Sequence, residues 1–193
     1  MRRTILCLLA LLFLPAPGRA QVPVFETTTS TSAIRFFVKA SVALVGNFDK
    51  WNSTLTFTSP DVTTGVLAID IEAATVNTGS GMKDSKLKSK DFFDVKENPT
   101  ITFRSTKIVQ TGPDTFDVIG NFSIRGVSRQ ETLKLHVTGK GTGTGDIKGV
   151  MAFDRKDYGM TSGIPFVKIA DRVEVDVDLK VQQTSGPRLV YQQ

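Results

Sequence analysis

The chain has 193 residues, with 24 lysines and arginines, 19 aspartates and glutamates, one histidine and one cysteine. This length fits one domain, and a hydrophobic fraction of 40% is enough to build a core, which excludes a disordered tail. A single histidine and a single cysteine argue against zinc fingers, iron–sulfur clusters and disulfide frameworks. They also leave no simple Ser-His or Cys-His catalytic pair. We therefore expect neither a metal site nor a catalytic residue.

Residues 1–20 have the features of a secretory signal peptide. Arg2 and Arg3 form a positive start, residues 4–14 are apolar, and Ala20 ends a small-residue cleavage site. The apolar run is too short to span a membrane, which takes about twenty residues. We expect cleavage after Ala20 and a periplasmic or secreted location. Residues 21–193 would then form one domain.

Removal of the signal peptide changes the charge of the chain. It takes away three arginines, so lysine plus arginine falls from 24 to 21 and the net charge falls from +5 to +2. The mature chain would contain no cysteine, because the single cysteine is Cys7. A charge of +2 without a basic cluster gives no reason to expect nucleic-acid binding.

Hydrophobic and polar residues alternate along most of the remaining chain, as in strands with one buried face. Eight segments show this pattern: 34–40, 51–57, 67–72, 101–105, 116–125, 133–138, 147–154 and 173–181. Short turn-like connections, such as residues 111–114, favour antiparallel hairpins, because parallel strands need long crossovers. The exception is residues 73–99, between the third and fourth strands, where Gly81 to Asp91 predicts a short helix. A helical turn is also expected at residues 42–49.

Eight strands with one apolar face each form either a closed barrel or a two-sheet sandwich. A barrel removes exposed strand edges, and eight strands enclose a space that side chains fill or that one small ligand occupies. The alternating pattern does not decide between an interior filled by side chains and one that holds a ligand. Ser53, Gly120 and Gly149 take inward positions, which leaves room for a ligand or for a neighbouring ring. In a hollow barrel, we expect a large apolar residue at either glycine to fill the void without unfolding the protein.

Three other features have simple explanations. The acidic residues Glu174, Asp176 and Asp178 share one strand face, but no loop adds oxygen ligands at calcium spacing, so we expect a solvated face. The glycine run at residues 139–145 lacks the spacing and the following helix of a nucleotide loop, which predicts a flexible hairpin. His136 lies on a polar strand face and is expected to be exposed.

The most specific motifs lie in residues 78–105. A Thr-Gly-Ser-Gly turn is followed by a cationic helix, by Phe92-Phe93-Asp94-Val95, and by Pro-x-Ile-x-Phe-x-Ser ending at Ser105. Further motif residues lie at Gly46–Phe48 with Trp51, Gly120–Val127, and Phe153 with Tyr158 and Gly159. With these motifs the chain resembles the YceI-like family of secreted, lipocalin-like proteins, from about residue 31 to residue 182.

This resemblance implies an all-β fold: an eight-stranded antiparallel lipocalin-like barrel with a short helix between strands 3 and 4. It also implies that the barrel encloses a long-chain isoprenoid or fatty amphiphile, without established catalysis and often as a homodimer. No cofactor is implied beyond a bound isoprenoid or other lipid. Two positions depart from the family pattern, because Lys86 and the Ala40-Ser41-Val42 stretch stand where histidines are common. Lysine stays cationic near neutral pH, which favours a phosphate or carboxylate head group.

We therefore predict a periplasmic or secreted binding protein. It would enclose a polyisoprenoid, an isoprenoid quinone precursor or a similar amphiphilic lipid for transport or storage. Two alternatives stay open. One is a barrel lyase or hydrolase that uses Asp84, Asp91 or Tyr158, for which the sign would be a carboxylate facing the ligand in a perturbed environment. The other is a stress-response protein whose barrel is filled by its own side chains.

The predicted ligand-binding residues fall into three sets. Leu87, Phe92 and Phe93 would close one end of the barrel as a lid. Asp84 and Lys86, on the cationic helix, would lie near the ligand head, because a helix start favours anions. The interior set consists of Phe36, Val38, Trp51, Leu55, Phe57, Leu67, Ile69, Phe103, Phe116, Phe122, Met151 and Phe153.

Overall fold

The computed structural model describes residues 21–41, 43–163 and 168–192, which contain eleven strands, four short 3₁₀ helices and one α-helix. The strands are β1 (Val24–Thr27), β2 (Ala33–Ala40), β3 (Leu44–Phe48), β4 (Trp51–Thr56), β5 (Val66–Glu72), β6 (Val76–Asn77), β7 (Thr100–Gln110), β8 (Thr115–Ile124), β9 (Val127–Thr138), β10 (Thr144–Asp154) and β11 (Ile169–Ser185). The helices are η1 (Thr29–Thr31), η2 (Val62–Thr64), η3 (Ala73–Thr75), α1 (Gly81–Lys88) and η4 (Arg155–Tyr158).

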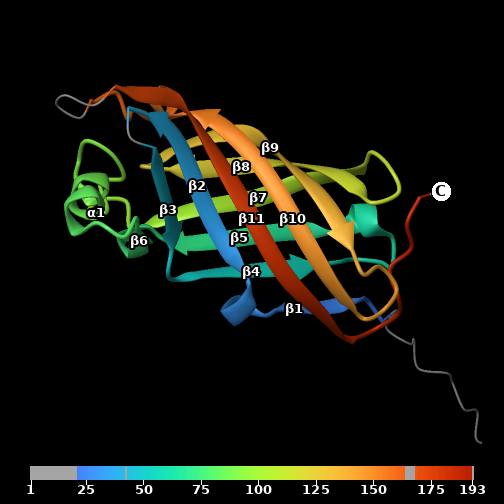
Figure 1. The fold of residues 1–193 in the computed structure, drawn as a ribbon. Coiled ribbons are helices and arrows are strands. Elements are labelled where there is room, and N and C mark those ends of the chain that lie inside the picture. Colours follow the sequence, from blue (N-terminus) through green and yellow to red (C-terminus); the bar gives the residue numbers. More distant parts are fainter. Residues whose placement is uncertain (1–20, 42, 164–167, 193) are drawn as a thin grey trace, which may run out of the picture.

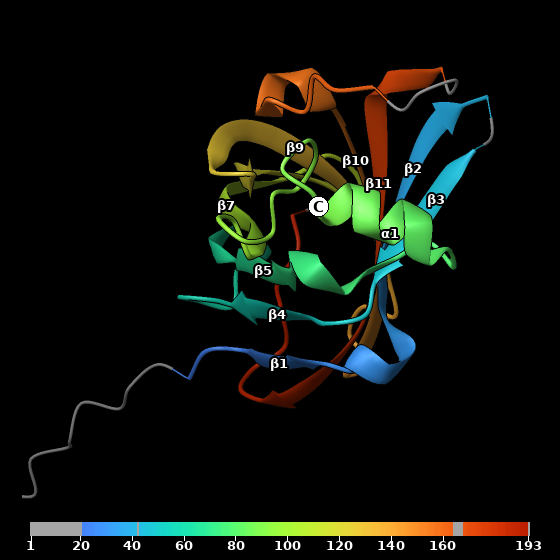
Figure 2. The ribbon, with the colours of Figure 1, turned by 90° about the vertical axis from the view of Figure 1, so that its left-hand side faces the viewer.

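One antiparallel sheet curls into a barrel (Figure 1). Its strand order is β4-β5-β7-β8-β9-β10-β11-β2-β3-β6, and β1 pairs with the last residues of β11. In the described residues no backbone ladder joins β1 to β4. These two strands nevertheless lie side by side (Figure 2), and the Ser53 hydroxyl donates a hydrogen bond to the Thr27 hydroxyl at 2.9 Å. The seam of the barrel is therefore closed by side chains.

The prediction of an antiparallel all-β barrel is confirmed, but the strand count was too low. The eight predicted strands correspond to β2, β4, β5 and β7 to β11, and the structure adds β1, β3 and β6. The short strands β1 and β6 have four and two residues, which is too few to show a period of two. Counting strands by the alternation of apolar and polar residues therefore misses strands that are too short to show it.

The helical turn expected at residues 42–49 is wrong, because β3 occupies this stretch. Val42, the first residue of the predicted turn, lies outside the described residues. Gly46 faces the interior, where a Cβ atom would lie 2.5 Å from Cζ of Phe36. An inward glycine makes room for this neighbouring ring, and it also hides the alternation that identifies a strand.

The expected helix after the glycine-rich turn is present but shorter than predicted. The helix α1 ends at Lys88 rather than at Asp91. It ends where the Ser89 hydroxyl donates a hydrogen bond to the Lys86 carbonyl at 2.7 Å and the backbone becomes extended. Figures 1 and 2 show α1 across one end of the barrel.

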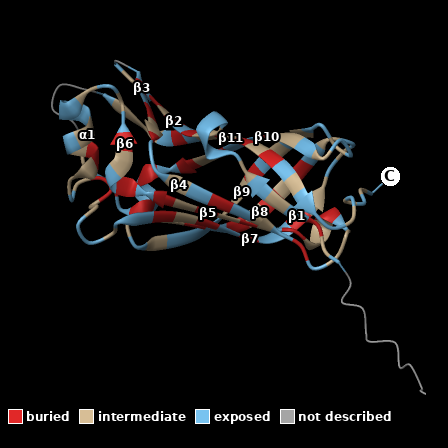
Figure 3. Ribbon diagram, turned by 90° about the horizontal axis from the view of Figure 1, so that it is seen from below, coloured by how far each residue is buried: buried red, intermediate tan, exposed pale blue. Residues whose placement is uncertain are grey.

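Buried and exposed residues alternate along the strands (Figure 3). The wall splits between β9 and β10, because these strands pair only along residues 146–150 of β10. Tyr158 packs at this split between the rings of Phe122 and Phe153, with centroid separations of 5.5 and 5.1 Å. Its hydroxyl donates a hydrogen bond to Glu131 at 2.9 Å. The helix η4 therefore seals the wall with an aromatic cluster.

The predicted signal peptide occupies residues 1–20, outside the described residues, so its cleavage stays a prediction. Within the described part of the chain, no helix has the length and apolar character needed to cross a membrane.

Candidate ligand-binding site

Three apolar cavities lie in a row inside the barrel. The loop-end cavity, of about 80 Å³, lies beside the hairpin at residues 139–143; the helix-end cavity, of about 60 Å³, lies beneath α1. A central cavity of about 30 Å³ separates them. The central cavity shares Phe122 and Val175 with the helix end, and its Ile69 lies two residues from Leu67 of the loop end. The row therefore follows the barrel axis.

These volumes define an interior that is partly filled. Each cavity exceeds the roughly 10–15 Å³ that one water needs. None reaches the roughly 300–1,000 Å³ of an ordinary ligand pocket. A long apolar chain would consequently have to push aside the side chains that now divide the row.

Most of the predicted interior and lid residues line these cavities. Fourteen of the seventeen predicted site residues do so: Phe36, Val38, Leu55, Phe57, Leu67, Ile69, Leu87, Phe92, Phe93, Phe103, Phe116, Phe122, Met151 and Phe153. Trp51 packs against the core but is absent from the cavity walls. Fourteen of the predicted residues therefore face the apolar interior, and their contact with a ligand stays a prediction.

The two predicted head-group residues, Asp84 and Lys86, line none of the three cavities. The Asp84 carboxylate accepts hydrogen bonds from the backbone and the hydroxyl of Thr78, at 2.8 and 2.6 Å. Lys86 forms an ion pair with Asp91 at 2.6 Å, and this hydrogen bond holds the pKa of Asp91 below its usual value. Both residues therefore stabilise the ends of α1, and the structure supplies no contact between them and the apolar interior.

The two inward glycines make room for neighbouring groups of the protein, which is one of the two alternatives that the sequence left open. A Cβ atom at Gly120 would lie 2.5 Å from the Arg104 carbonyl oxygen, beside the irregular register of β7. At Gly149 it would lie 2.7 Å from Cδ2 of Leu135 and 3.0 Å from Cδ1 of Leu133. Backbone and leucine side chains occupy the space that a larger residue would fill in a hollow barrel. Neither glycine points into an empty part of the barrel.

The helix end of the barrel is closed by the segment that follows α1. Leu87, Phe92 and Phe93 are only 5%, 3% and 7% exposed, and all three line the helix-end cavity. The backbone holds the segment in place, because Phe93 donates to the Leu87 carbonyl and Asp94 donates to the Ser89 carbonyl, each at 2.9 Å. The predicted lid is therefore a tightly hydrogen-bonded cap.

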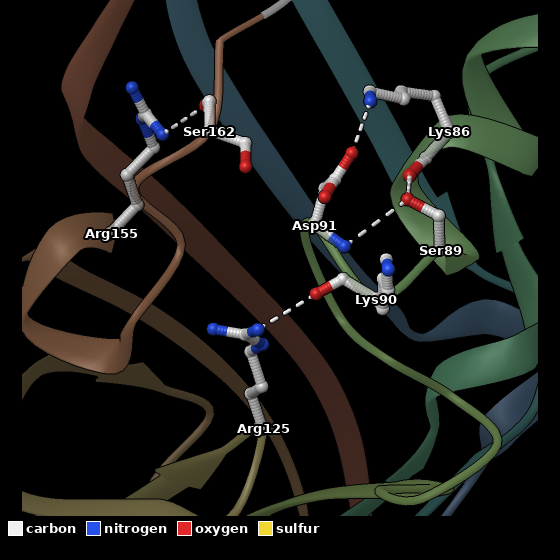
Figure 4. A network of polar contacts seen from close by, with 7 residues as sticks. All are labelled: Lys86, Ser89, Lys90, Asp91, Arg125, Arg155 and Ser162. Carbon is white, nitrogen blue, oxygen red and sulfur yellow. Dashed lines mark hydrogen bonds and ion pairs between the residues drawn. The ribbon is translucent and has the colours of Figure 1, made fainter.

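Two arginines that were not among the predicted site residues lie at this end of the barrel, and one of them, Arg125, anchors the cap (Figure 4). Arg125 donates to the Lys90 carbonyl at 2.7 Å and to the Gly159 carbonyl, which ties the cap to the end of η4. Arg155 is 5% exposed and lines the helix-end cavity. Arg125 ends the predicted strand 116–125 as a polar position and Arg155 begins η4, so the sequence pattern marks neither residue as a contact of the cap or the cavity.

The charge of Arg155 is fully engaged by its surroundings. Its guanidinium forms an ion pair with Asp171 at 2.9 Å and donates to the carbonyls of Ser162, at 2.8 Å, and Met160. The hydrogen bond from Lys156, helped by Arg155, lowers the pKa of Asp171 below its usual value. A buried arginine with these partners rigidifies the cavity wall and has little capacity left for a ligand.

The loop end of the barrel is built differently. Its cavity is lined by Lys140 in the hairpin and by Arg188, Leu189 and Tyr191 after β11. The Lys140 ammonium pairs with Asp114 at 2.6 Å and lies 4.8 Å from the centre of the Tyr191 ring. Burial raises the pKa of the Tyr191 hydroxyl above its usual value. This end thus combines an apolar cavity with a cationic rim.

The three side chains considered for an enzymatic role each interact with a different residue of the protein. Asp84 binds Thr78, Asp91 binds Lys86, and Tyr158 binds Glu131. Burial, helped by Glu131, raises the pKa of Tyr158 far above its usual range, so this phenol stays protonated. Among the described residues, no three His, Cys, Asp or Glu side chains are grouped as metal ligands.

A curled antiparallel barrel with an apolar interior defines a lipocalin-like protein. The model of the YceI-like domain matches residues 25–181, and the chain accordingly belongs to the YceI-like family. A UPF0312 protein of Azotobacter vinelandii is 31% identical over 98 residues. That match covers 51% of this chain and spans about half the length of the relative.

Two solved structures share the fold. The crystal structure of Burkholderia cenocepacia BcnA aligns with a TM-score of 0.73 and 25% identity, covering 80% of this chain and 99% of that one. A polyisoprenoid binding domain from Saccharophagus degradans, implicated in plant cell wall breakdown, aligns with a TM-score of 0.68 and 17% identity. This second alignment covers 83% of this chain and 99% of the other.

Proposed function

We propose that this protein binds a polyisoprenoid or a similar long apolar chain along the barrel axis. The observation that carries the proposal is the row of three apolar cavities, whose walls contain most of the inward aromatic residues. Burying one CH₂ group gains about 0.8 kcal/mol, so an isoprene unit offers roughly 3–4 kcal/mol before association costs. A few units are enough to offset the several kcal/mol lost on association. The polyisoprenoid binding domain that shares the fold supports this ligand class.

We further propose that the protein is exported and carries or stores its lipid in the periplasm or outside the cell. The signal-like sequence of residues 1–20 supports export. Binding rather than catalysis is supported by the engagement of Asp84, Asp91 and Tyr158 in contacts within the protein. A homodimer stays a prediction.

The proposal is tested by identifying and titrating the ligand. Solvent extracts of the purified protein, analysed by mass spectrometry, are expected to contain a prenyl lipid. Calorimetric titration with farnesol, geranylgeraniol and solanesol is expected to show affinity rising with chain length, because each added unit buries more apolar surface. Empty extracts together with no binding of any of the three alcohols would refute the proposal.

A matched pair of variants separates a binding barrel from a filled one. Val175 lines both the central and the helix-end cavity, whereas Val150, on β10, is exposed on the outer face. We expect Val175→Phe to fill the row, to keep a cooperative thermal transition and to lose prenyl binding. Val150→Phe should bind like the wild type. If Val175→Phe unfolds the protein while the wild type binds no prenyl chain, the barrel is a packed core.

A further inference from the structure

The segment Gly186–Gln192, here called the strap, crosses the loop end of the barrel. It turns away from β11 at Gly186, which has a φ of +82°, and where a Cβ atom would lie 2.0 Å from the Val22 carbonyl oxygen. Val190 then donates to the Pro60 carbonyl at 2.8 Å and accepts from the Val62 amide at 3.0 Å. The backbone therefore directs the strap across the barrel end toward η2.

The strap places apolar side chains over the loop-end cavity. Leu189 and Tyr191 are half-buried and line that cavity, and the Tyr191 ring lies 6.2 Å from the Phe116 ring. Beyond them, Gln192 exchanges hydrogen bonds of 2.7 and 2.9 Å with the Gln110 side chain. The Gln183 side chain also donates to the carbonyls of Gly186 and Pro187, at 3.0 and 2.7 Å, so the strap is held by hydrogen bonds at its start, at Val190 and at Gln192. Moving it would extend the largest of the three cavities to solvent.

The rim around the strap is positively charged. Lys140 and Arg188 line the cavity, and no aspartate or glutamate does so. Arg188 is exposed and has no ion-pair partner among the described residues. At the helix end, by contrast, the lining charge belongs to Arg155, which is already bound to Asp171. An anion at the loop end could bind Arg188 directly. It could bind Lys140 only by replacing Asp114 as the partner of that ammonium group.

We propose that lipid enters and leaves the barrel at the loop end, with the strap as its gate. We also propose that the head group is a phosphate or a carboxylate lying between Lys140 and Arg188. In this arrangement the apolar chain displaces Leu189 and Tyr191 from the mouth and extends toward the helix end. The inference rests on the proposed function. It concerns a segment that lies beyond the family match, which ends at residue 181.

The gate is tested by locking it. Asp61 and Val190 are bridge partners, so cysteines at these positions are placed for a disulfide that holds the strap closed. In a Cys7→Ser background, we expect the oxidised D61C/V190C protein to take up geranylgeraniol at least tenfold more slowly than the reduced protein. Unchanged uptake in the oxidised form would overturn the gate.

A second pair of variants tests the gate without a cross-link. Leu189→Ala combined with Tyr191→Ala removes the apolar contacts of the strap, and we expect faster uptake and faster release, each by at least threefold. Arg125→Ala loosens the cap at the helix end and should leave both rates unchanged. Faster exchange in Arg125→Ala alone would place the entrance at the helix end and contradict the proposal.

The head group is tested with three probes that share one chain: geranylgeranyl phosphate, geranylgeranoic acid and geranylgeraniol. Lys140→Gln and Arg188→Gln should weaken binding of the two anions about tenfold while leaving the alcohol unaffected. A loss confined to the phosphate or to the acid identifies which head group is used. Lys148→Gln, on the outer face of β10, serves as the control. Selective loss in Lys86→Gln instead would place the head group beside α1 and overturn this assignment.

Failure of the inference is distinguishable from failure of the proposed function. If the wild type binds no prenyl probe, the lipid-binding function itself is refuted. If the wild type binds but the locked strap exchanges lipid normally, only the gate is refuted. If all three probes lose affinity equally in the Lys140 and Arg188 variants, these residues shape the mouth without recognising an anion.

Discussion

The two ends of the barrel are both covered by apolar side chains, yet they are anchored in different ways. At the helix end, the cap that carries Leu87, Phe92 and Phe93 is fastened by Arg125 and by internal backbone hydrogen bonds. At the loop end, the strap leaves its leucine and tyrosine half-buried, and its hydrogen bonds are those of Val190, of Gln192 and from the Gln183 side chain. Segments with few buried contacts open at a smaller free-energy cost than well-packed ones. A covered cavity is therefore not necessarily a firmly closed one. How well the cap and the strap are buried and anchored decides which end of the barrel opens.

The largest expected effect is at the anchored end. We expect Arg155→Met to destabilise the protein by about 4 kcal/mol, because it removes the buried partner of Asp171 and of three backbone carbonyls. Chemical denaturation measures the loss. Arg172→Ala, which removes an exposed pair with Glu174, should cost less than about 1 kcal/mol. Equal losses in the two variants would show that the helix end is not anchored by its buried charge.

Matched leucine truncations compare the two covers directly. Leu87→Ala should cost about 3 kcal/mol, because it opens a cavity under a buried side chain. Leu189→Ala should cost about 1 kcal/mol, because Leu189 is only half-buried and its surroundings can relax. The measurement is the free energy of unfolding from urea titrations. If both losses were the same, the two ends would be equally closed.

The two inward glycines in the middle of the barrel have surroundings of different rigidity. We expect Gly120→Ala to cost about 2 kcal/mol more than Gly149→Ala. The new methyl group meets backbone at position 120, whereas at position 149 it meets the ends of two leucine side chains that can rotate. Thermal unfolding of the two variants tests the order. The reverse order would mean that the leucines beside Gly149 are as fixed as the sheet.

The smallest effect is a pH dependence shared by both ends. Hydrogen bonds from Lys86 and Lys140 lower the pKa values of Asp91 and Asp114, respectively. Such a group stabilises the fold above its unfolded pKa, which is about 3.9 for aspartate, and this contribution is lost as pH falls through the folded value. We expect Asp91→Asn and Asp114→Asn to lose less stability than the wild type between neutral pH and about pH 3. Denaturation midpoints across this range give the comparison, and identical slopes in all three proteins would contradict it.

A period of two, repeated in eight segments, was sufficient to predict antiparallel strands with an apolar inner face, whereas the choice of a barrel over a sandwich came from the resemblance to the YceI-like family. The pattern could not reveal β3, where Gly46 replaces an inward side chain to admit the Phe36 ring. It also missed Arg125 and Arg155, whose partners are backbone carbonyls brought together by the tertiary fold. The burial of the apolar side chains in the strap could not be predicted from the local sequence either, because other parts of the chain form the barrel end that they cover.

The long strand β11 has a consequence for the order of folding. It pairs with β10 along most of its length, with β2 near its start and with β1 at its end. Two of these partners lie at the other end of the chain, so their contacts span about 130 to 160 residues. Contacts of such high sequence separation slow folding. The N-terminal strands β1 and β2 must therefore wait, unpaired on that side, until β11 has been synthesised, and an interruption of synthesis before residue 169 would leave these edges available for aggregation.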